Sequence, residues 1–301
     1  MRQPAPLKQG DTVALAATAR KVSPEEMAPA IERLRSWGLN VKVPDGLYES
    51  ENQFAGSDSH RAELLQSLLD DTEVKAILCC RGGYGTVRIV DRLDFSLLKK
   101  YPKWIVGYSD VTVLHSHLHT TLGLPTLHAT MPINFGPEET PATRSLRQAL
   151  FSESADIEWD ATFPGRKGEA EGIVVGGNLS ILYSLCGSPS ALDTRGKILL
   201  IEDLDEYLYH IDRMMQNLKR NGMLDGLAAL VVGGMTDMHD NSIPFGRKAE
   251  EIIMETVAEY PYPVVFNAPF GHLGDNNLAL PLGIKMHLDG TDSKKCRIFA
   301  P

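Results

Sequence analysis

The stretch WIVGYSDVTVLHSHL, residues 104–118, joins a short apolar segment directly to a helical pattern, with Ser109 at the junction. An apolar run that leads into a helix is typical of a strand in a sheet that helices cover on both faces. Ser109 itself has two interpretations. It caps the helix by accepting hydrogen bonds from free N–H groups, or it is a nucleophile on a sharp turn. Gly107 fits the turn, but Val111 stands where the pattern GxSxG has its second glycine.

The same alternation of strand and helix extends from this stretch toward the N-terminus. Apolar runs and helical patterns follow one another at residues 12–18, 24–37, 41–44, 59–71 and 74–80. Strands that alternate with helices of this length indicate βαβ units. The sequence therefore predicts an α/β fold whose first sheet is mainly parallel.

The composition of the sequence changes in the middle of the chain. Residues 136–167 are richer in proline, glycine and charge, and they contain one helical piece near residues 140–151. Beyond them, helical patterns near 207–222 and 246–259 are mixed with many short strand-like runs. We predict an N-terminal domain at residues 1–135, a linker region at 136–167, and a strand-richer, mixed α/β C-terminal domain at 168–301.

The composition excludes several classes of function. The chain has 301 residues and a formal net charge of −9, and it lacks the basic surface that nucleic-acid binding requires. No segment is apolar for the roughly 18 residues that a membrane span needs, and no signal-type cleavage site follows the first apolar run. The four cysteines form no CxxC spacing. We expect a soluble cytoplasmic protein without a cofactor or metal, and with neither nucleic acid nor membrane as a partner.

The segment CCRGGYGTVR, residues 79–88, is the first candidate for chemistry. A strand ends here, and a glycine-rich turn opens what the pattern predicts to be a helix. Such a turn exposes backbone N–H groups to a ligand at the carboxyl end of a strand. It matches neither GxGxxG nor a Walker loop. The turn is either a ligand or oxyanion loop or a tight structural turn.

Two further residues complete a candidate constellation with Ser109. Glu202 ends the apolar run ILLIE, and His272 lies in a glycine-flanked loop in NAPFGHLG. Glu202 belongs either to an acidic loop that caps the next helix or to a site where it orients a histidine. His272 is either a surface residue or a general base. The pair His115 and His119 has zinc-ligand spacing but no HExxH carboxylate, so we expect no metal site. The order Ser, Glu, His leads to a serine hydrolase hypothesis.

A set of short motifs, in order and spacing, resembles the LD-carboxypeptidase family of serine peptidases, the muramoyltetrapeptide carboxypeptidases. The motifs are RGGYG (81–85), GYSD (107–110), GGNLSIL (176–182), LLIED (199–203), IDRM (211–214) and FGH to LPLG (270–283). The resemblance covers essentially the whole chain. It implies a Rossmann-like N-terminal domain that carries the serine, and a strand-richer C-terminal domain that supplies a glutamate and a histidine. It also implies a cytoplasmic, homodimeric enzyme of murein recycling that releases D-alanine from a tetrapeptide.

The resemblance also implies a role for each site residue. Ser109 would be the nucleophile, His272 the base and Glu202 the carboxylate that orients it. The oxyanion donors would be the backbone N–H groups of Asp110 and Gly83. Separately, a carboxypeptidase must hold a terminal carboxylate, and Arg81 is the cation nearest to the glycine turn. Arg81 either binds that carboxylate or forms a salt bridge that shapes the turn.

Two other functions are compatible with these residues. One is a microcin-immunity type peptidase of the same family, which hydrolyses an acyl-sulfamoyl-nucleotide peptide and is expected to stack an aromatic residue on the base. Trp159 is the only tryptophan of the second half, and it lies near the linker, which favours the murein peptide. The other is a non-catalytic protein that binds a sugar or phosphate at the glycine turn.

Overall fold

The computed structural model describes residues 3–152, 155–292 and 294–301. Its first half alternates strands with helices, as the sequence predicts. In chain order the elements are β1 (Thr12–Ala16), α1 (Pro24–Ser36), β2 (Asn40–Lys42), α2 (Asp58–Asp70), β3 (Val74–Cys79), α3 (Ser96–Lys100), β4 (Trp104–Gly107), α4 (Thr112–Leu122), β5 (Thr126–His128) and α5 (Pro141–Phe151).

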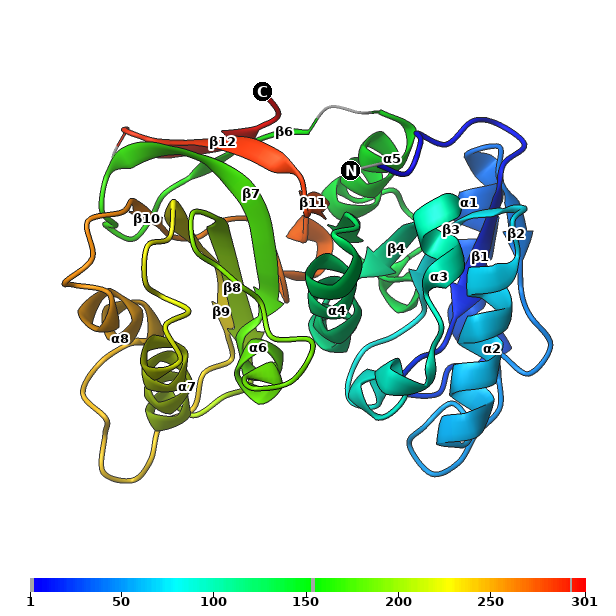
Figure 1. The fold of residues 1–301 in the computed structure, drawn as a ribbon, viewed down its shortest axis with the longest axis horizontal. Coiled ribbons are helices and arrows are strands. Elements are labelled where there is room, and N and C mark those ends of the chain that lie inside the picture. The colour runs from blue at the N-terminus through cyan, green and yellow to red at the C-terminus, as the bar shows by residue number, and fades with distance from the viewer. Residues whose placement is uncertain (1–2, 153–154, 293) are drawn as a thin grey trace.

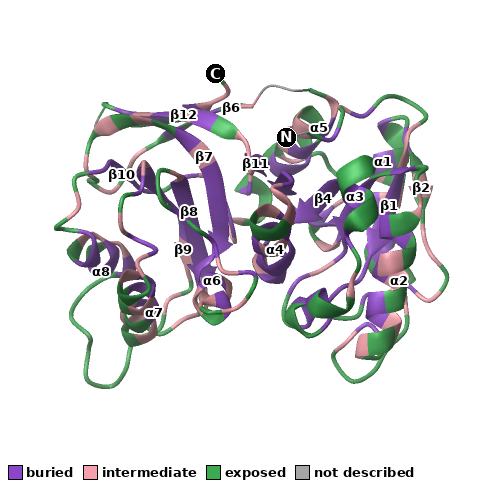
Figure 2. Cartoon of the chain, viewed as in Figure 1, coloured by how far each residue is buried: buried purple, intermediate pink, exposed green. Residues whose placement is uncertain are grey.

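The first sheet has the strand order β11-β5-β4-β3-β1-β2. All neighbours from β5 to β2 are parallel, and only β11 (Leu280–Leu282) pairs in the antiparallel direction, with β5. The strands β1, β3 and β4 are almost entirely buried, because helices pack on both faces of the sheet (Figure 2). The predicted parallel sheet is confirmed, and the carboxyl ends of its strands form one edge.

The second half contains a larger sheet in the order β10-β9-β8-β7-β12-β13-β6. Strands β7 to β10 are parallel, and the remaining neighbours are antiparallel. Its elements are β6 (Asp156–Asp160), β7 (Gly168–Asn178), α6 (Leu179–Leu185), β8 (Ile198–Leu204), α7 (Leu208–Arg220), β9 (Ala229–Thr236), α8 (Ala249–Thr256), β10 (Val264–Val265), β12 (Lys285–Gly290) and β13 (Lys295–Phe299). The predicted α/β class, with a strand-richer second half, is confirmed.

The two sheets lie side by side, and α4 runs between them in contact with β7 and α6 (Figure 1). Strand β11 comes from the second half of the sequence but completes the first sheet. The segment predicted as a linker is divided between the two bodies: Leu146 and Leu150 of α5 join the first core, and β6 joins the second sheet. The division of the chain at 136–167 stays a prediction.

One predicted element differs in the structure. The glycine turn after β3 leads into two short 3₁₀ turns, Thr86–Arg88 and Val90–Arg92, where the pattern predicted a helix. This segment is rich in β-branched residues, which lose side-chain freedom in an α-helix. Within the described ranges, no helix is long and apolar enough to cross a bilayer.

Candidate active site

Ser109 lies on a sharp turn between β4 and α4. Its φ is +62°, a left-handed conformation that costs an L-residue about 1–2 kcal/mol. The side chain of Ser109 caps neither the 3₁₀ turn that it begins nor α4. Val111 packs over Gly107, where an added Cβ would lie 2.7 Å from Val111 Cγ2. The helix therefore approaches the strand closely without a second glycine, and the strained turn favours the nucleophile interpretation over the cap.

The glycine turn of residues 81–85 lies directly beside this serine. A Cβ added to Gly82 would be 3.1 Å from Ser109 Oγ. Gly83 has a φ of +105°, which favours glycine. The turn and the serine loop are clamped together by Asp110, whose Oδ2 accepts a hydrogen bond of 2.9 Å from Thr86 N. Burial raises the pKa of the Asp110 carboxyl, which is only 1% exposed.

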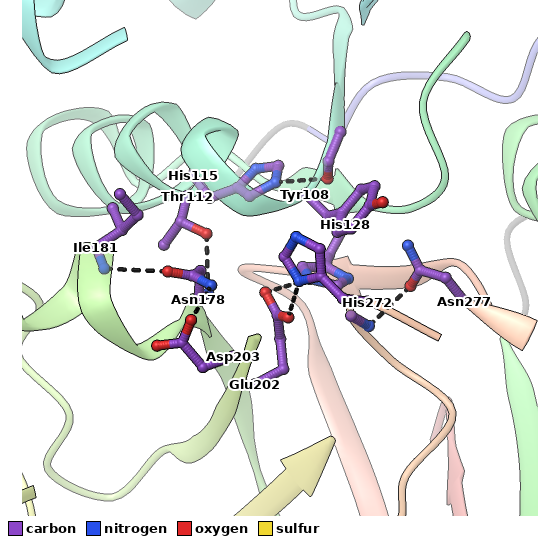
Figure 3. Close-up of polar contacts among 12 residues, drawn as sticks. Tyr108, Thr112, His115, His128, Asn178, Ile181, Glu202, Asp203, His272 and Asn277 are labelled. Atoms are coloured by element: carbon purple, nitrogen blue, oxygen red, sulfur yellow. Dashed lines mark hydrogen bonds and ion pairs between the residues drawn. The ribbon is translucent and has the colours of Figure 1, made fainter. Parts of the chain in front are cut away.

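Glu202 and His272 form a hydrogen-bonded pair at the carboxyl edge of the second sheet, in which His272 is partly buried (Figure 3). His272 Nδ1 lies 2.7 Å from Glu202 Oε2, and Glu202 is fully buried on β8. Burial lowers the pKa of His272, but the hydrogen bond and charge of Glu202 outweigh it and raise the pKa above its ordinary value. With Nδ1 donating to the carboxylate, Nε2 is the acceptor of the neutral imidazole. That is the arrangement of a general base.

The electrostatics of Glu202 keep it ionised. Burial by itself raises the pKa of this carboxyl, and its interactions with His128 and His272 lower it to about 2. His128 Nε2 lies 4.0 Å from Glu202 Oε1, and neither side chain is exposed. His128 comes from the end of β5 in the first sheet, so the carboxylate has a histidine from each half of the chain.

The loop around His272 leaves little free space. Gly271 has a φ of +98°, and an added Cβ would lie 2.6 Å from Glu202 Cγ. Gly271 N donates a hydrogen bond of 2.9 Å to Asn277 Oδ1. The ring of Tyr108, next to Ser109, has its centroid 4.8 Å from that of His272. These contacts fix the histidine beside the serine turn.

The two halves of the chain meet around one cavity of about 500 Å³. Among the residues that line it are Arg20, Arg81, Gly82, Gly83, Tyr108, Ser109, Asp110, Asn178, Asp203, Asp205, Glu206 and His272. The structure thus brings together five predicted site residues: Ser109, His272, Gly83, Asp110 and Arg81. Glu202 does not line the cavity but is hydrogen-bonded to His272. Arg81 also contacts Glu26, with 3.4 Å between Nη1 and Oε1.

Asn178 and Asp203 tie the second half to α4. Asn178 Nδ2 donates to Asp203 Oδ1 over 2.9 Å, and the backbone N–H of Asn178 donates to Thr112 Oγ1 over 3.0 Å (Figure 3). Burial and the nearby charge of Glu202 raise the pKa of Asp203 to about 7. In the part of the chain that the structure describes, no group of three or more histidine, cysteine, aspartate or glutamate side chains is arranged to hold a metal.

Sequence reasoning missed three contributors to this site: His128, Arg20 and Asp203. His128 ends β5, Asp203 lies near the end of β8, and Arg20 lies four residues beyond the end of β1. The carboxyl ends of parallel strands are where ligands of α/β proteins usually bind. This rule could have pointed to all three residues. It picks them out from other strand-end residues only when the order of the strands in the sheets is known.

Comparison with known proteins agrees with this arrangement. Residues 12–129 match the LD-carboxypeptidase N-terminal domain, and residues 171–288 match the LD-carboxypeptidase C-terminal domain. A protein of Bacillus subtilis named probable murein peptide carboxypeptidase is 38% identical, over 94% of this chain and 90% of its own length.

Solved structures show the same fold. A muramoyltetrapeptide carboxypeptidase from Oxalobacter formigenes superposes with a TM-score of 0.88 at 27% identity, covering 96% of this chain and 99% of its own. An MccF-like protein from Bacillus anthracis superposes with a TM-score of 0.85 at 26% identity, covering 100% and 99%. Both family domains are matched in order, and the relatives cover nearly the full length, so this chain belongs to the LD-carboxypeptidase family.

Proposed function

We propose that this chain is a serine carboxypeptidase that releases the terminal D-alanine from murein tetrapeptides in the cytoplasm, as part of cell-wall recycling. The observation that carries the proposal is the hydrogen bond of 2.7 Å between Glu202 and His272, in a cavity that His272 shares with the strained Ser109. The name of the Bacillus subtilis relative supports the murein peptide as the substrate.

In the proposed reaction, Ser109 is the nucleophile and His272 the general base. Nε2 of His272 takes the hydroxyl proton as Oγ attacks the carbonyl that precedes D-alanine. The ionised Glu202 keeps the proton on Nδ1 and stabilises the imidazolium that forms. His272 then protonates the leaving amine. Water, activated by the same histidine, hydrolyses the acyl-enzyme and restores Ser109.

The negative charge of the tetrahedral intermediate needs N–H donors. We assign this role to the backbone N–H groups of Gly83 and Asp110, which both line the cavity. The first lies in the glycine turn beside Ser109, and the second at the start of the 3₁₀ turn Ser109–Val111. By analogy with other oxyanion holes, each donor contributes about 3 kcal/mol to transition-state stabilisation.

The test is release of free D-alanine from a diaminopimelate tetrapeptide, measured by mass spectrometry. The wild-type chain should release it, a pentapeptide should not be cut, and Ser109→Ala should lose on the order of 10⁴-fold or more in kcat. Ser116→Ala is the matched control, because this buried serine of α4 does not line the cavity and its Oγ has no hydrogen-bond partner among the described residues. Full activity in Ser109→Ala would overturn the mechanism.

The same assay includes a nucleotide-linked peptide. Trp159 does not line the cavity: it is 8% exposed, and its Nε1 donates to the backbone oxygen of Phe266, just after β10. It is therefore not positioned to stack on a base, which favours the murein peptide. Cleavage of the nucleotide-linked peptide alone would replace the proposed substrate, and binding of murein peptide without turnover would make the chain a binding protein.

The remaining expectations accompany this proposal. We propose a homodimer, which sedimentation of the purified chain would test. We also propose that the chain needs no metal, so that activity survives dialysis against a chelator. Domain boundaries at 1–135 and 168–301 are tested by limited proteolysis, with cutting expected within 136–167.

A further inference from the structure

A carboxypeptidase must recognise the free carboxylate at the end of its substrate. In this cavity the second half of the chain contributes Asp205 and Glu206, whose negative charges, together with that of the partly ionised Asp203, disfavour a second carboxylate nearby. The glycine-turn wall carries the arginines Arg20 and Arg81. One of these two residues is therefore the local cation that offsets the acidic surroundings.

Arg81 already has an anionic partner. Its Nη1 lies 3.4 Å from Glu26 Oε1. The other oxygen of Glu26 accepts a hydrogen bond of 2.9 Å from Ser23 N, as part of the capping box that begins α1. Since Glu26 is held in place by the helix start, its charge stays beside Arg81 and offsets it.

Arg20 has no ion pair among the residues that the structure describes. It follows β1, and its neighbours are fixed on both sides: Ala55 N donates to Ala19 O over 3.1 Å, and Lys21 N donates to Gln53 O over 3.0 Å. The backbone that carries this cation is therefore held in place before a substrate arrives.

The side chain of Arg20 lies across Gly83. A Cβ added to Gly83 would be 2.7 Å from both Cδ and Nε of Arg20, while a Cβ added to the preceding Gly82 would be 3.1 Å from Ser109 Oγ. The stem of the arginine and the serine thus contact successive residues of the same turn. Any other residue at 83 would displace the arginine, so the glycine serves the arginine as well as the turn.

The position suits the end of a peptide. The last residue of a substrate places its carboxylate one residue, about 3.8 Å along the Cα trace, beyond the carbonyl that Ser109 attacks. The Arg20 side chain lies against Gly83, the residue assigned as an oxyanion donor, so its guanidinium is close to where that carboxylate must lie. A guanidinium holds a carboxylate with two parallel hydrogen bonds. Building on the proposed function, we infer that Arg20, and not Arg81, binds the terminal carboxylate of the substrate.

The test compares a tetrapeptide with the same peptide ending in D-alaninamide. Wild type should prefer the free acid by about 10–100-fold in kcat/KM, the value of a hydrogen bond to a charged group. Arg20→Ala should lose this factor on the acid and change little on the amide. Arg20→Lys should keep part of the preference for the acid. Lysine retains the positive charge but cannot form the two parallel hydrogen bonds of a guanidinium.

Arg81→Ala is the matched comparison, and it should keep the wild-type ratio of acid to amide. The inference is overturned if Arg20→Ala keeps that ratio, or if Arg81→Ala is the variant that loses it. Direct binding separates this result from the proposed function. In the Ser109→Ala background, calorimetry should find the acid bound more tightly than the amide, and adding Arg20→Ala should abolish the difference. Equal binding of acid and amide in Ser109→Ala would overturn the inference even if the wild-type chain releases D-alanine.

Discussion

At the scale of single residues, the charge of Glu202 is the feature on which the proposed chemistry depends most. Glu202→Gln keeps the size of the side chain but removes the charge that stabilises the imidazolium of His272. We expect kcat/KM to fall on the order of 10⁴-fold, as when the triad aspartate of a serine protease becomes asparagine. The measurement is D-alanine release from the tetrapeptide under subsaturating conditions.

The pH dependence of this variant tests whether Glu202 raises the pKa of His272. His272 must be neutral to accept the serine proton, so activity is lost as the pH falls through its pKa. Glu202 raises that pKa, so activity in the wild type should fall at a higher pH than the ordinary histidine pKa predicts, and Glu202→Gln should move this fall to lower pH. Glu171→Gln, at the surface pair of Glu171 and His287, is the control and should leave the pH of this fall unchanged. If Glu202→Gln loses activity at the same pH as the wild type, then Glu202 does not control the pKa of the group that titrates.

Part of this candidate site could be predicted from residue type and sequence context alone. Ser109 and Glu202 adjoin apolar runs that end in polar residues, and His272 stands among glycines, so each could be named from the sequence. His128 and Arg20 could not, because their importance depends on which strands are neighbours. His128 meets Glu202 only because β5 lies beside the boundary between the sheets.

At the scale of elements, the loop between β10 and β11 decides whether Glu202 and His272 meet. Gly271 and Gly274 both have positive φ, +98° and +58°, but only Gly271 lacks room for a side chain. Gly271→Ala should therefore cost the backbone strain of about 1–2 kcal/mol and also displace Glu202, whose Cγ is 2.6 Å from the added Cβ. Gly274→Ala, with nothing within 4 Å, should cost the strain alone.

The two variants are compared by urea unfolding and by kcat/KM. We expect both to lower the free energy of unfolding, and only Gly271→Ala to lose most of its activity. Similar activity in the two variants would mean that the loop adapts and that the position of Glu202 is not fixed by Gly271.

The elements themselves were predicted well where periodicity was strong and poorly where it was short. The amphipathic pattern near 207–222 became α7, and the apolar run 12–18 contains β1. One of the short strand-like runs expected in the second half, NLALPLG at residues 277–283, contains β11. Its pairing with β5 was not predictable, because strand partners depend on the whole topology and not on local pattern.

At the scale of the whole molecule, several contacts join the two halves of the chain. Strand β11 pairs with β5, and the backbone N–H of Asn178 donates to Thr112 Oγ1 over 3.0 Å. His117 Nδ1 lies 2.9 Å from Ser190 Oγ. Since the site itself takes residues from both sheets, the same contacts that hold the halves together set the distance between the serine turn and the histidine loop.

We therefore expect the halves to unfold together. Calorimetry should give one transition whose calorimetric and van't Hoff enthalpies agree. Thr112→Val removes the acceptor for Asn178 N and leaves a buried donor unsatisfied, at a cost of about 1–3 kcal/mol. This variant should lower the Tm of the whole transition by about 2 °C or more. Thr121→Val, which alters an exposed hydroxyl of the same helix, should change it little. Two separate transitions, with Thr112→Val moving only one of them, would show instead that the halves are independent and that the site is assembled by docking of two bodies that fold separately.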